Sequence, residues 1–295
     1  MPDAPAAPDT SATPGTAGAA HDGLSEALRD GAKQRIDTSR ASSARLYDLY
    51  VGGKDHYGVD KDAGTRLAEA FHTEGAIQRI GLGARLFHDR AVRYATTDLG
   101  MDQFLDIGVG VPKEPNTHEI AQAIRPSSRV VYVDNDPIVL RHAEALLHSG
   151  PEGATDYADA DLREPAEVLA IARRTLALDR PVALMLCSVL QFVPDDDQVR
   201  DLMSQYLAAL APGSCVIFSH VTDDFEPEAW RETERIYAEE GIAANVRPRA
   251  TIESFVSGLD LVEPGLVECH LWHPDGTDDS KDHTHLYAAI GLKRP

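Results

Sequence analysis

The sequence predicts an α/β fold in which a largely parallel sheet is preceded by a layer of helices. From residue 103 onward, short β-rich segments alternate with amphipathic helical patterns, which is typical of a parallel sheet covered by helices on both faces. The region 23–100 is helical in pattern, and two strand-like segments at the C-terminus are expected to form an antiparallel hairpin on the sheet edge. We therefore expect 23–100 to pack on an α/β core, 101–295, within a single domain.

Composition limits the classes of protein that this chain can belong to. Residues 1–22 contain almost no branched or aromatic side chains and lack the pattern of a secretory signal, so they are predicted to be a disordered tail. The purest apolar run, Val182–Cys187, is far shorter than the ~20 residues of a membrane span. A formal charge of −20 argues against a nucleic-acid partner, and three widely spaced cysteines indicate reduced thiols. We expect a soluble, cytoplasmic protein with no membrane partner.

The individual elements follow from local signals. A helix is expected in "SSARLYDLYVGG", ending at Gly52 and Gly53. Five strands are expected in "QFLDI", "RVVYVD", "TDYADA", "PVALMLC" and "SCVIFSH". Helices are predicted between them, most clearly over 195–211, and after the fifth strand over 227–240. The last two strands are expected in "GLVECHLW" and "THLYAAIGL".

The first of these strands leads into a glycine turn that indicates a ligand site. In an open parallel sheet, ligands bind beyond the carboxyl ends of the strands, and Gly108 and Gly110 allow a ligand to approach the backbone there. A dinucleotide site requires a third glycine at 113, where Lys113 stands instead. Asn116 and Glu119 form a predicted capping box that starts the next helix only after an intervening loop. This pattern favours a ligand with few phosphate contacts over NAD.

Two acidic residues follow the next two strands. Asp134 ends the second strand, where a carboxylate can accept from both hydroxyls of a ribose. Asp161 follows the third strand and can accept from an adenine amino group. Each aspartate alone is more often a turn former, but their order along the chain indicates an adenosine ligand.

Longer motifs carry a resemblance to a known family. They are "ARLYDLYVGGKDHYGVD", "FLDIGVGVPKEPNTHEIAQ", "VVYVDNDPIVLRHAEALL", "DADLREPAEVL", "VLQFVPDDD" and "GLDLVEPGLV". From about Ala41 to Leu292 the chain resembles the bacterial S-adenosylmethionine-dependent methyltransferase-like family formerly catalogued as a domain of unknown function. The resemblance implies a class I methyltransferase fold, with a Rossmann-like seven-stranded sheet whose last strand is antiparallel, and S-adenosylmethionine as cofactor. Members of the family mostly have no known methyl acceptor.

The resemblance also implies roles for individual residues. Cofactor contacts are expected from the following residues of the core: Asp106, Gly108 and Gly110 for the methionine end, Asp134 and Asn135 near the ribose, Asp161 and Leu162 at the adenine, and Ser188, within Cys187–Val189, at the pocket floor. Pro112 departs from the common class I pattern, which usually has a third glycine, so the contact to the methionine carboxylate is left open.

The N-terminal segment offers a second set of candidates. Gly53 is expected to permit backbone approach to the cofactor and Lys54 to meet a carboxylate, and the alternative is a helix end followed by a solvated turn. Tyr47, Tyr50 and Tyr57 either line the pocket, facing the sulfonium, or belong to the core.

No single catalytic base stands out. His56, His118 and His220 are candidates, although each fits a packing or surface role more often. One C-terminal hairpin contains several possible metal ligands: Cys269, His270, His273, His283 and His285. We do not expect a metal site there, because neighbouring residues of a strand point to opposite faces and the loop between the strands is long and polar.

The sequence therefore predicts a methyltransferase that acts on a small-molecule acceptor. It identifies neither the acceptor nor the oligomeric state. One alternative is a sensor or interaction protein that binds the cofactor without turnover. A nicotinamide-dependent oxidoreductase is the other, and Lys113 and the terminal hairpin argue against it.

Overall fold

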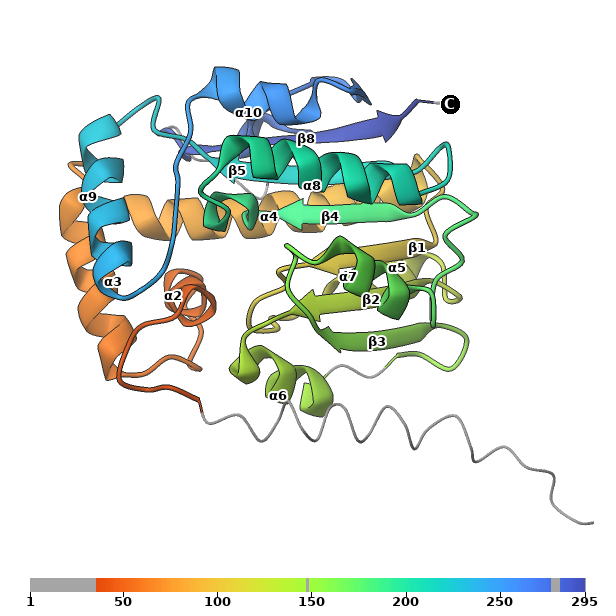
Figure 1. The fold of residues 1–295 in the computed structure, drawn as a ribbon, viewed down its shortest axis with the longest axis horizontal. Helices are drawn as coiled ribbons and strands as arrows, with labels where there is room; N and C mark the ends of the chain where they lie inside the picture. The colour runs from red at the N-terminus through yellow and green to blue at the C-terminus, as the bar shows by residue number, and fades with distance from the viewer. Residues whose placement is uncertain (1–35, 147–148, 277–281, 295) are drawn as a thin grey trace, which may run out of the picture.

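The computed structural model describes residues 36–146, 149–276 and 282–294 (Figure 1). The predicted disordered tail, 1–22, and the start of the segment 23–100 lie outside the described residues. Within the described ranges, no helix has both the length and the hydropathy needed to cross a bilayer.

The centre of the molecule is one mixed sheet with the strand order β3-β2-β1-β4-β5-β8-β6. All five strands predicted in its parallel part are confirmed: β1 (Gln103–Ile107), β2 (Arg129–Asp134), β3 (Ala154–Asp159), β4 (Ala183–Cys187) and β5 (Cys215–Val221). The chain builds outward from β1 to β3 and then crosses to β4 on the other side of β1. This reversal creates a switch point at the carboxyl ends of β1 and β4, where open α/β sheets bind their ligands.

The C-terminal strands differ in part from the predicted edge hairpin. β8 (Leu286–Lys293) is antiparallel to β5, as predicted, but it lies inside the sheet, between β5 and the short β6 (Leu259–Leu261). Of the first predicted strand only β7 (Val267–Glu268) pairs with β8. The predicted antiparallel pair is therefore present at this edge of the sheet, but β7 is only two residues long and β6 pairs with the end of β8 beside it.

The chain after β7 leaves the sheet as a 3₁₀ turn, Cys269–Leu271, for a specific reason. The buried guanidinium of Arg90 donates to the carbonyl oxygens of Cys269, at 2.7 Å, and Trp272, at 3.1 Å. Because these carbonyl groups bond to a helix residue, they are not available for strand pairing.

Helices cover both faces of the sheet (Figure 1). One face packs on α4 (Ala76–Thr97) and α5 (Thr117–Ile124), and the other on α7 (Pro165–Ala172), α8 (Asp196–Ala209) and α10 (Arg249–Val256). α6 (Pro137–Leu146) contacts β3. Successive residues of β2 point to opposite faces of the sheet. Tyr132 packs in the core that includes α4, and Val131 packs in the core that includes α8.

A group of helices lies beyond the carboxyl ends of the parallel strands (Figure 1). It consists of α2 (Ser43–Tyr50), α3 (Gly58–Ala70) and α9 (Pro227–Glu239). The Ser42 hydroxyl caps α2 by accepting from the Arg45 N–H, and the helix ends before Gly52, whose φ is 74°. A buried ion pair of 2.8 Å joins Arg45 to Asp60 of α3. The predicted helices 195–211 and 227–240 are confirmed as α8 and α9.

Candidate functional site

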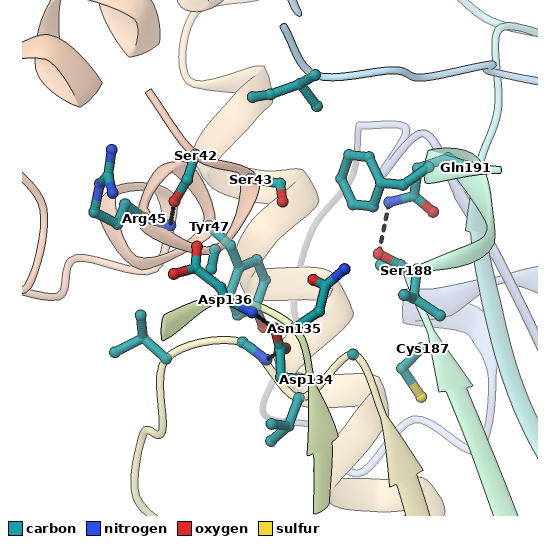
Figure 2. Close-up of a pocket in the computed structure, with 18 of the residues that line it drawn as sticks. Ser42, Ser43, Arg45, Tyr47, Asp134, Asn135, Asp136, Cys187, Ser188 and Gln191 are labelled. Atoms are coloured by element: carbon teal, nitrogen blue, oxygen red, sulfur yellow. Dashed lines mark hydrogen bonds between the residues drawn. The ribbon is translucent and has the colours of Figure 1, made fainter. Parts of the chain in front are cut away.

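A cavity of about 710 Å³ lies at the switch point, between the carboxyl ends of β1–β4 and the helices α2, α4 and α9. Its size falls within the range of small-molecule and cofactor sites. Figure 2 shows Asp134 and Asn135, at the end of β2, on one side of this space, and Ser188 and Gln191, after β4, on the other. The residues around it therefore come from segments far apart in the sequence.

The glycine turn after β1 contributes backbone to the cavity. Gly108 and Gly110 have φ angles of 75° and 66°, which few other residues adopt. A Cβ at Gly108 would come within 2.4 Å of Val189 Cγ2, so packing also excludes a side chain there. At Gly110 the nearest atom is Tyr47 Cδ1 at 3.9 Å, which leaves the backbone open to a ligand. The predicted capping box of Asn116 then starts α5 after the intervening loop.

Asp134 is the best-placed carboxylate of the site. Its Oδ2 accepts from the Gly110 N–H and its Oδ1 from the Asp136 N–H, both at 2.9 Å. Burial raises the pKa of Asp134 to about 6, although these two backbone donors favour the ionised form. Each carboxylate oxygen can accept a second hydrogen bond, so a ligand with two hydroxyls can still be bound.

Asp161 lines the same cavity after β3, together with Leu162. Arg163 donates to both of its carboxylate oxygens, at 2.9 and 2.5 Å, and Asn135 Nδ2 donates to one of them at 3.2 Å. The hydrogen bonds from Arg163 hold the pKa of Asp161 below its usual value. Asp161 therefore stays ionised, and part of its accepting capacity is already taken.

The turn after β4 combines backbone strain with an unsatisfied polar group. Ser188 has a φ of 52°, unusual for a residue with a side chain. Its carbonyl oxygen accepts from Gln191 Nε2 at 2.7 Å. Gln191 is only 7% exposed, and its Oε1 has no hydrogen-bond partner among the described residues. Strained residues that persist in a fold are frequent at functional sites.

His88 of α4 also lines the cavity and was missed in the sequence. Its Nε2 lies 2.9 Å from Thr117 Oγ1, which donates to Asp106 Oδ2 at 2.7 Å, and its Nδ1 lies 3.0 Å from Asp89 Oδ1. Burial lowers the pKa of His88, but the carboxylates of Asp106 and Asp89 outweigh burial and raise it above the usual value. The two carboxylates therefore favour the protonated form of His88.

The three histidines considered as bases do not line the cavity. His56 Nδ1 is 2.8 Å from Asp48 Oδ2, and the buried His118 is 2.8 Å from the Tyr132 hydroxyl. His220 is buried 3.0 Å from a guanidinium nitrogen of Arg247, and burial lowers its pKa to about 3. Each ring contacts other protein groups, which is the packing role weighed for it in the sequence.

Only some of the N-terminal candidates line the cavity. Tyr47 and Tyr50 line the cavity, whereas Tyr57, 39% exposed, does not. Gly53 and the exposed Lys54 also lie outside it. Gly53 packs on Asp48 instead, because an added Cβ would lie 1.6 Å from a carboxylate oxygen of that residue.

Two of the C-terminal histidines lie near one carboxylate. His283 Nδ1 lies 2.8 Å from Glu268 Oε1, and His270 Nδ1 lies 3.7 Å from Glu268 Oε2. Within residues 36–146, 149–276 and 282–294, no group of three or more His, Cys, Asp or Glu side chains is placed to hold a metal ion.

Comparison with known proteins gives the family. The model of the S-adenosyl methyltransferase family matches residues 29–294. The chain is 43% identical to a DUF574 family protein from Streptomyces avermitilis, with a TM-score of 0.84 over 88% of this chain and 100% of that one. It is 34% identical to a candidate methyltransferase from Thermobifida fusca, with a TM-score of 0.80 over 88% of this chain and 97% of the other. No protein of curated function matches the sequence.

These matches extend across the glycine turn, the strand ends and the helices that surround the cavity. They agree with the resemblance seen in the sequence motifs and give no support to a nicotinamide-dependent oxidoreductase. The chain belongs to the S-adenosyl methyltransferase family, and it is an S-adenosylmethionine-dependent methyltransferase with the class I methyltransferase fold.

Proposed function

We propose that this enzyme transfers the methyl group of S-adenosylmethionine to a small-molecule acceptor bound in the same cavity. One observation carries the proposal. The cavity joins the strand-end residues expected to hold the cofactor to apolar side chains of α4 and α9, such as Ile77, Ile80 and Trp230. It thus has a polar end for the cofactor and a second, apolar end for an acceptor.

The residues at the polar end fit the cofactor. The free accepting capacity of Asp134, beside Asn135, suits the ribose hydroxyls, and Asp161 with Leu162 suits the adenine. The open backbone of Gly110 suits the methionine end, together with Gly108 and Asp106. The cofactor supplies an electrophilic methyl group on a positively charged sulfur.

Placement of the acceptor is the main contribution that we assign to the chain. Methyl transfer is an in-line displacement, so holding the acceptor against the methyl group removes much of the barrier. His56, His118 and His220 do not line the cavity, and both ring nitrogens of His88 are engaged, one with Thr117 and one with Asp89, so we assign no catalytic base. The helices of 23–100 form part of the cavity wall, so we propose that 23–100 and 101–295 act as one catalytic unit.

The test follows the methyl group. The protein is incubated with methyl-deuterated S-adenosylmethionine and a panel of small amines, phenols, carboxylic acids and thiols, and mass spectrometry measures S-adenosylhomocysteine and labelled product. We expect one class of acceptor to give both in equal amounts, and Asp134→Asn to lose this activity. Saturable binding of the cofactor with no S-adenosylhomocysteine from any acceptor would contradict the proposal and favour a sensor that does not turn over.

A further inference from the structure

The cationic side chains of the cavity differ in how far the protein already satisfies them. Among the described residues, the arginine and lysine side chains that line the cavity are Arg40, Arg45, Arg85, Lys113 and Arg163. Arg45 forms its buried ion pair with α3, and Arg163 pairs with the aspartate that follows β3. Lys113 Nζ donates to the carbonyl oxygen that follows α2, and Arg40 is exposed, where water can solvate it. Arg85 is the remaining cation of the cavity wall.

Arg85, on α4, is only partly satisfied by its neighbours. Its Nη2 donates to the Pro115 carbonyl oxygen and lies 3.1 Å from Asp89 Oδ1, an oxygen that also lies 3.0 Å from His88 Nδ1. Both contacts of Arg85 use the same nitrogen, so its Nε and Nη1 make no hydrogen bond or ion pair with a described residue. The side chain is only 14% exposed. A guanidinium in such a place is stabilised by an anion that accepts from its fork of N–H groups.

The position of Arg85 corresponds to one end of the cofactor. The segment from β1 to α5 carries both the glycine turn and the carbonyl oxygen that accepts from Arg85. His88, one turn further along α4, has its Nε2 3.8 Å from Asp106 Oδ2. A cofactor whose ribose is bound by Asp134 extends past the open backbone of Gly110 toward Asp106, where the methionine end is expected. Arg85 is therefore the cation beside the amino-acid end.

Tyr47, on α2, closes the same part of the cavity. Figure 2 shows this side chain directed from α2 toward the strand ends, and its Cδ1 lies 3.9 Å from the position of a Cβ on Gly110. Burial raises the pKa of Tyr47 to about 12, and the positive charge of Arg85 opposes this shift. The hydroxyl is thus protonated at neutral pH and lies within electrostatic reach of Arg85. It makes no hydrogen bond to a described residue, so it can donate to a ligand.

Resting on the proposed function, we infer that Arg85 and Tyr47 bind the carboxylate of the cofactor's methionine moiety and make cofactor affinity depend on that group. Arg85 supplies the positive charge and N–H donors, and Tyr47 supplies one O–H donor. Asp106 has the charge that suits the ammonium group of the same amino acid. Pro112 leaves the carboxylate contact of the glycine turn open, and these two side chains fill that role. Both are positioning residues, since a fixed amino-acid end holds the sulfur–methyl bond in one direction.

The first part of the test compares ligands that differ by one group. Calorimetry measures the binding of S-adenosylhomocysteine, of 5′-S-(3-aminopropyl)-5′-thioadenosine, which lacks the carboxylate, and of 5′-S-(3-carboxypropyl)-5′-thioadenosine, which lacks the amino group. We expect the ligand without the carboxylate to bind the parent roughly 30-fold more weakly than S-adenosylhomocysteine, because hydrogen bonds between charged groups are lost. Affinities of these two ligands within about threefold of each other would overturn the inference.

The second part changes the residues. Arg85→Met keeps a long side chain but removes the charge and the donors. We expect S-adenosylhomocysteine and the ligand without the amino group each to bind this variant roughly 30-fold more weakly than they bind the parent. The ligand without the carboxylate should bind both proteins alike, so the 30-fold ratio is lost. Tyr47→Phe removes one neutral donor and should reduce the ratio about fivefold. A ratio in Arg85→Met equal to that of the parent contradicts the inference, even if both affinities fall.

Matched control variants come from the same cavity. Tyr50→Phe removes a tyrosine hydroxyl from the same helix as Tyr47, and Arg163→Met removes a guanidinium from the adenine end. Both variants should keep the ratio of the parent, whatever their effect on the affinities themselves. Loss of the ratio in Arg163→Met as well would show that it reflects the overall charge of the cavity, and this would overturn the assignment to Arg85.

These measurements separate the two proposals. Failure of the parent protein to bind S-adenosylhomocysteine counts against the proposed function. Normal S-adenosylhomocysteine binding that does not depend on the carboxylate counts against the roles of Arg85 and Tyr47 alone. If thermal melting shows that Arg85→Met is unfolded, the comparison of ligands on the parent and on Tyr47→Phe still decides the question.

Discussion

Replacement of Asp134 by asparagine isolates the carboxylate on which cofactor binding most depends. In the parent, both carboxylate oxygens accept backbone N–H groups at 2.9 Å and face the cavity with spare accepting capacity. Asparagine keeps the shape, but its NH₂ group must face one of the two N–H donors. The ligand hydroxyls then meet a neutral group with fewer acceptor positions.

The expected magnitudes differ for binding and for folding. Loss of hydrogen bonds to a charged acceptor costs about 1–3 kcal/mol, or roughly 5- to 150-fold in the dissociation constant. Burial raises the pKa of Asp134 from 3.8 to about 6, so keeping it ionised at pH 7 costs the folded state at most about 3 kcal/mol. The variant is relieved of this cost but leaves one backbone N–H unsatisfied, which costs about 1–3 kcal/mol. We therefore expect a large loss of affinity with little change in the free energy of unfolding.

The pH dependence gives the sharper assay. Ligand hydroxyls donate to the ionised carboxylate, so binding lowers the pKa of Asp134 from its ligand-free value of about 6. The free protein then takes up a proton as the pH falls through 6, and the bound protein does not. Calorimetric titrations with S-adenosylhomocysteine from pH 5 to 8 should show affinity falling below pH 6, by up to about tenfold per pH unit, in the parent and not in Asp134→Asn. Affinity within twofold in the variant, or the same pH profile in both proteins, would refute the reasoning.

Three further predictions concern the surroundings of the site. Gly110→Val, at a φ of 66° and facing the cavity, should abolish S-adenosylhomocysteine binding while circular dichroism still shows a folded protein; retained binding would contradict the assignment of the turn. The raised pKa of His88 predicts a stability contribution that is complete below pH 6.5 and is lost as the pH rises through the folded-state pKa. Urea unfolding from pH 6 to 9 should show the free energy of unfolding falling with pH in the parent and not in His88→Gln. The same change with pH in both proteins would contradict this contribution of His88. Arg247→Met removes the donors that hold the turn after β4 and should cost at least about 3 kcal/mol of unfolding free energy in denaturant titration, so an unchanged midpoint would be inconsistent with that role.

The parallel part of the sheet and its glycine turn were predictable because their signals are local. The β-rich segments, the glycines at 108 and 110 and the capping box at Asn116 each depend on neighbours in the sequence. The position of β8 was not predictable in this way. Its apolar run is compatible with an edge or an interior place, and the contacts of Arg90 that draw the preceding segment off the sheet join residues about 180 apart in the chain.

The polar residues of the cavity show the same limit. His88 lies within a long helix, and only the packing of α4 beside α5 brings it to Thr117 and Asp106. Gln191 had a visible signal, a single polar residue among apolar ones directly after a predicted strand, in "SVLQFV". His220 stands at a strand end on the expected side, but its side chain points into the core, where burial favours the neutral ring. Position along the chain therefore located the site better than it identified the side chains that enter it.

The central claim is that the cavity at the switch point binds S-adenosylmethionine. Calorimetric titration of the purified protein with S-adenosylmethionine, S-adenosylhomocysteine and NAD in parallel tests it most directly, because a ligand of the folded state must bind saturably. We predict micromolar binding of the first two ligands and none of NAD. Binding of NAD alone, or of none of the three, would contradict the account.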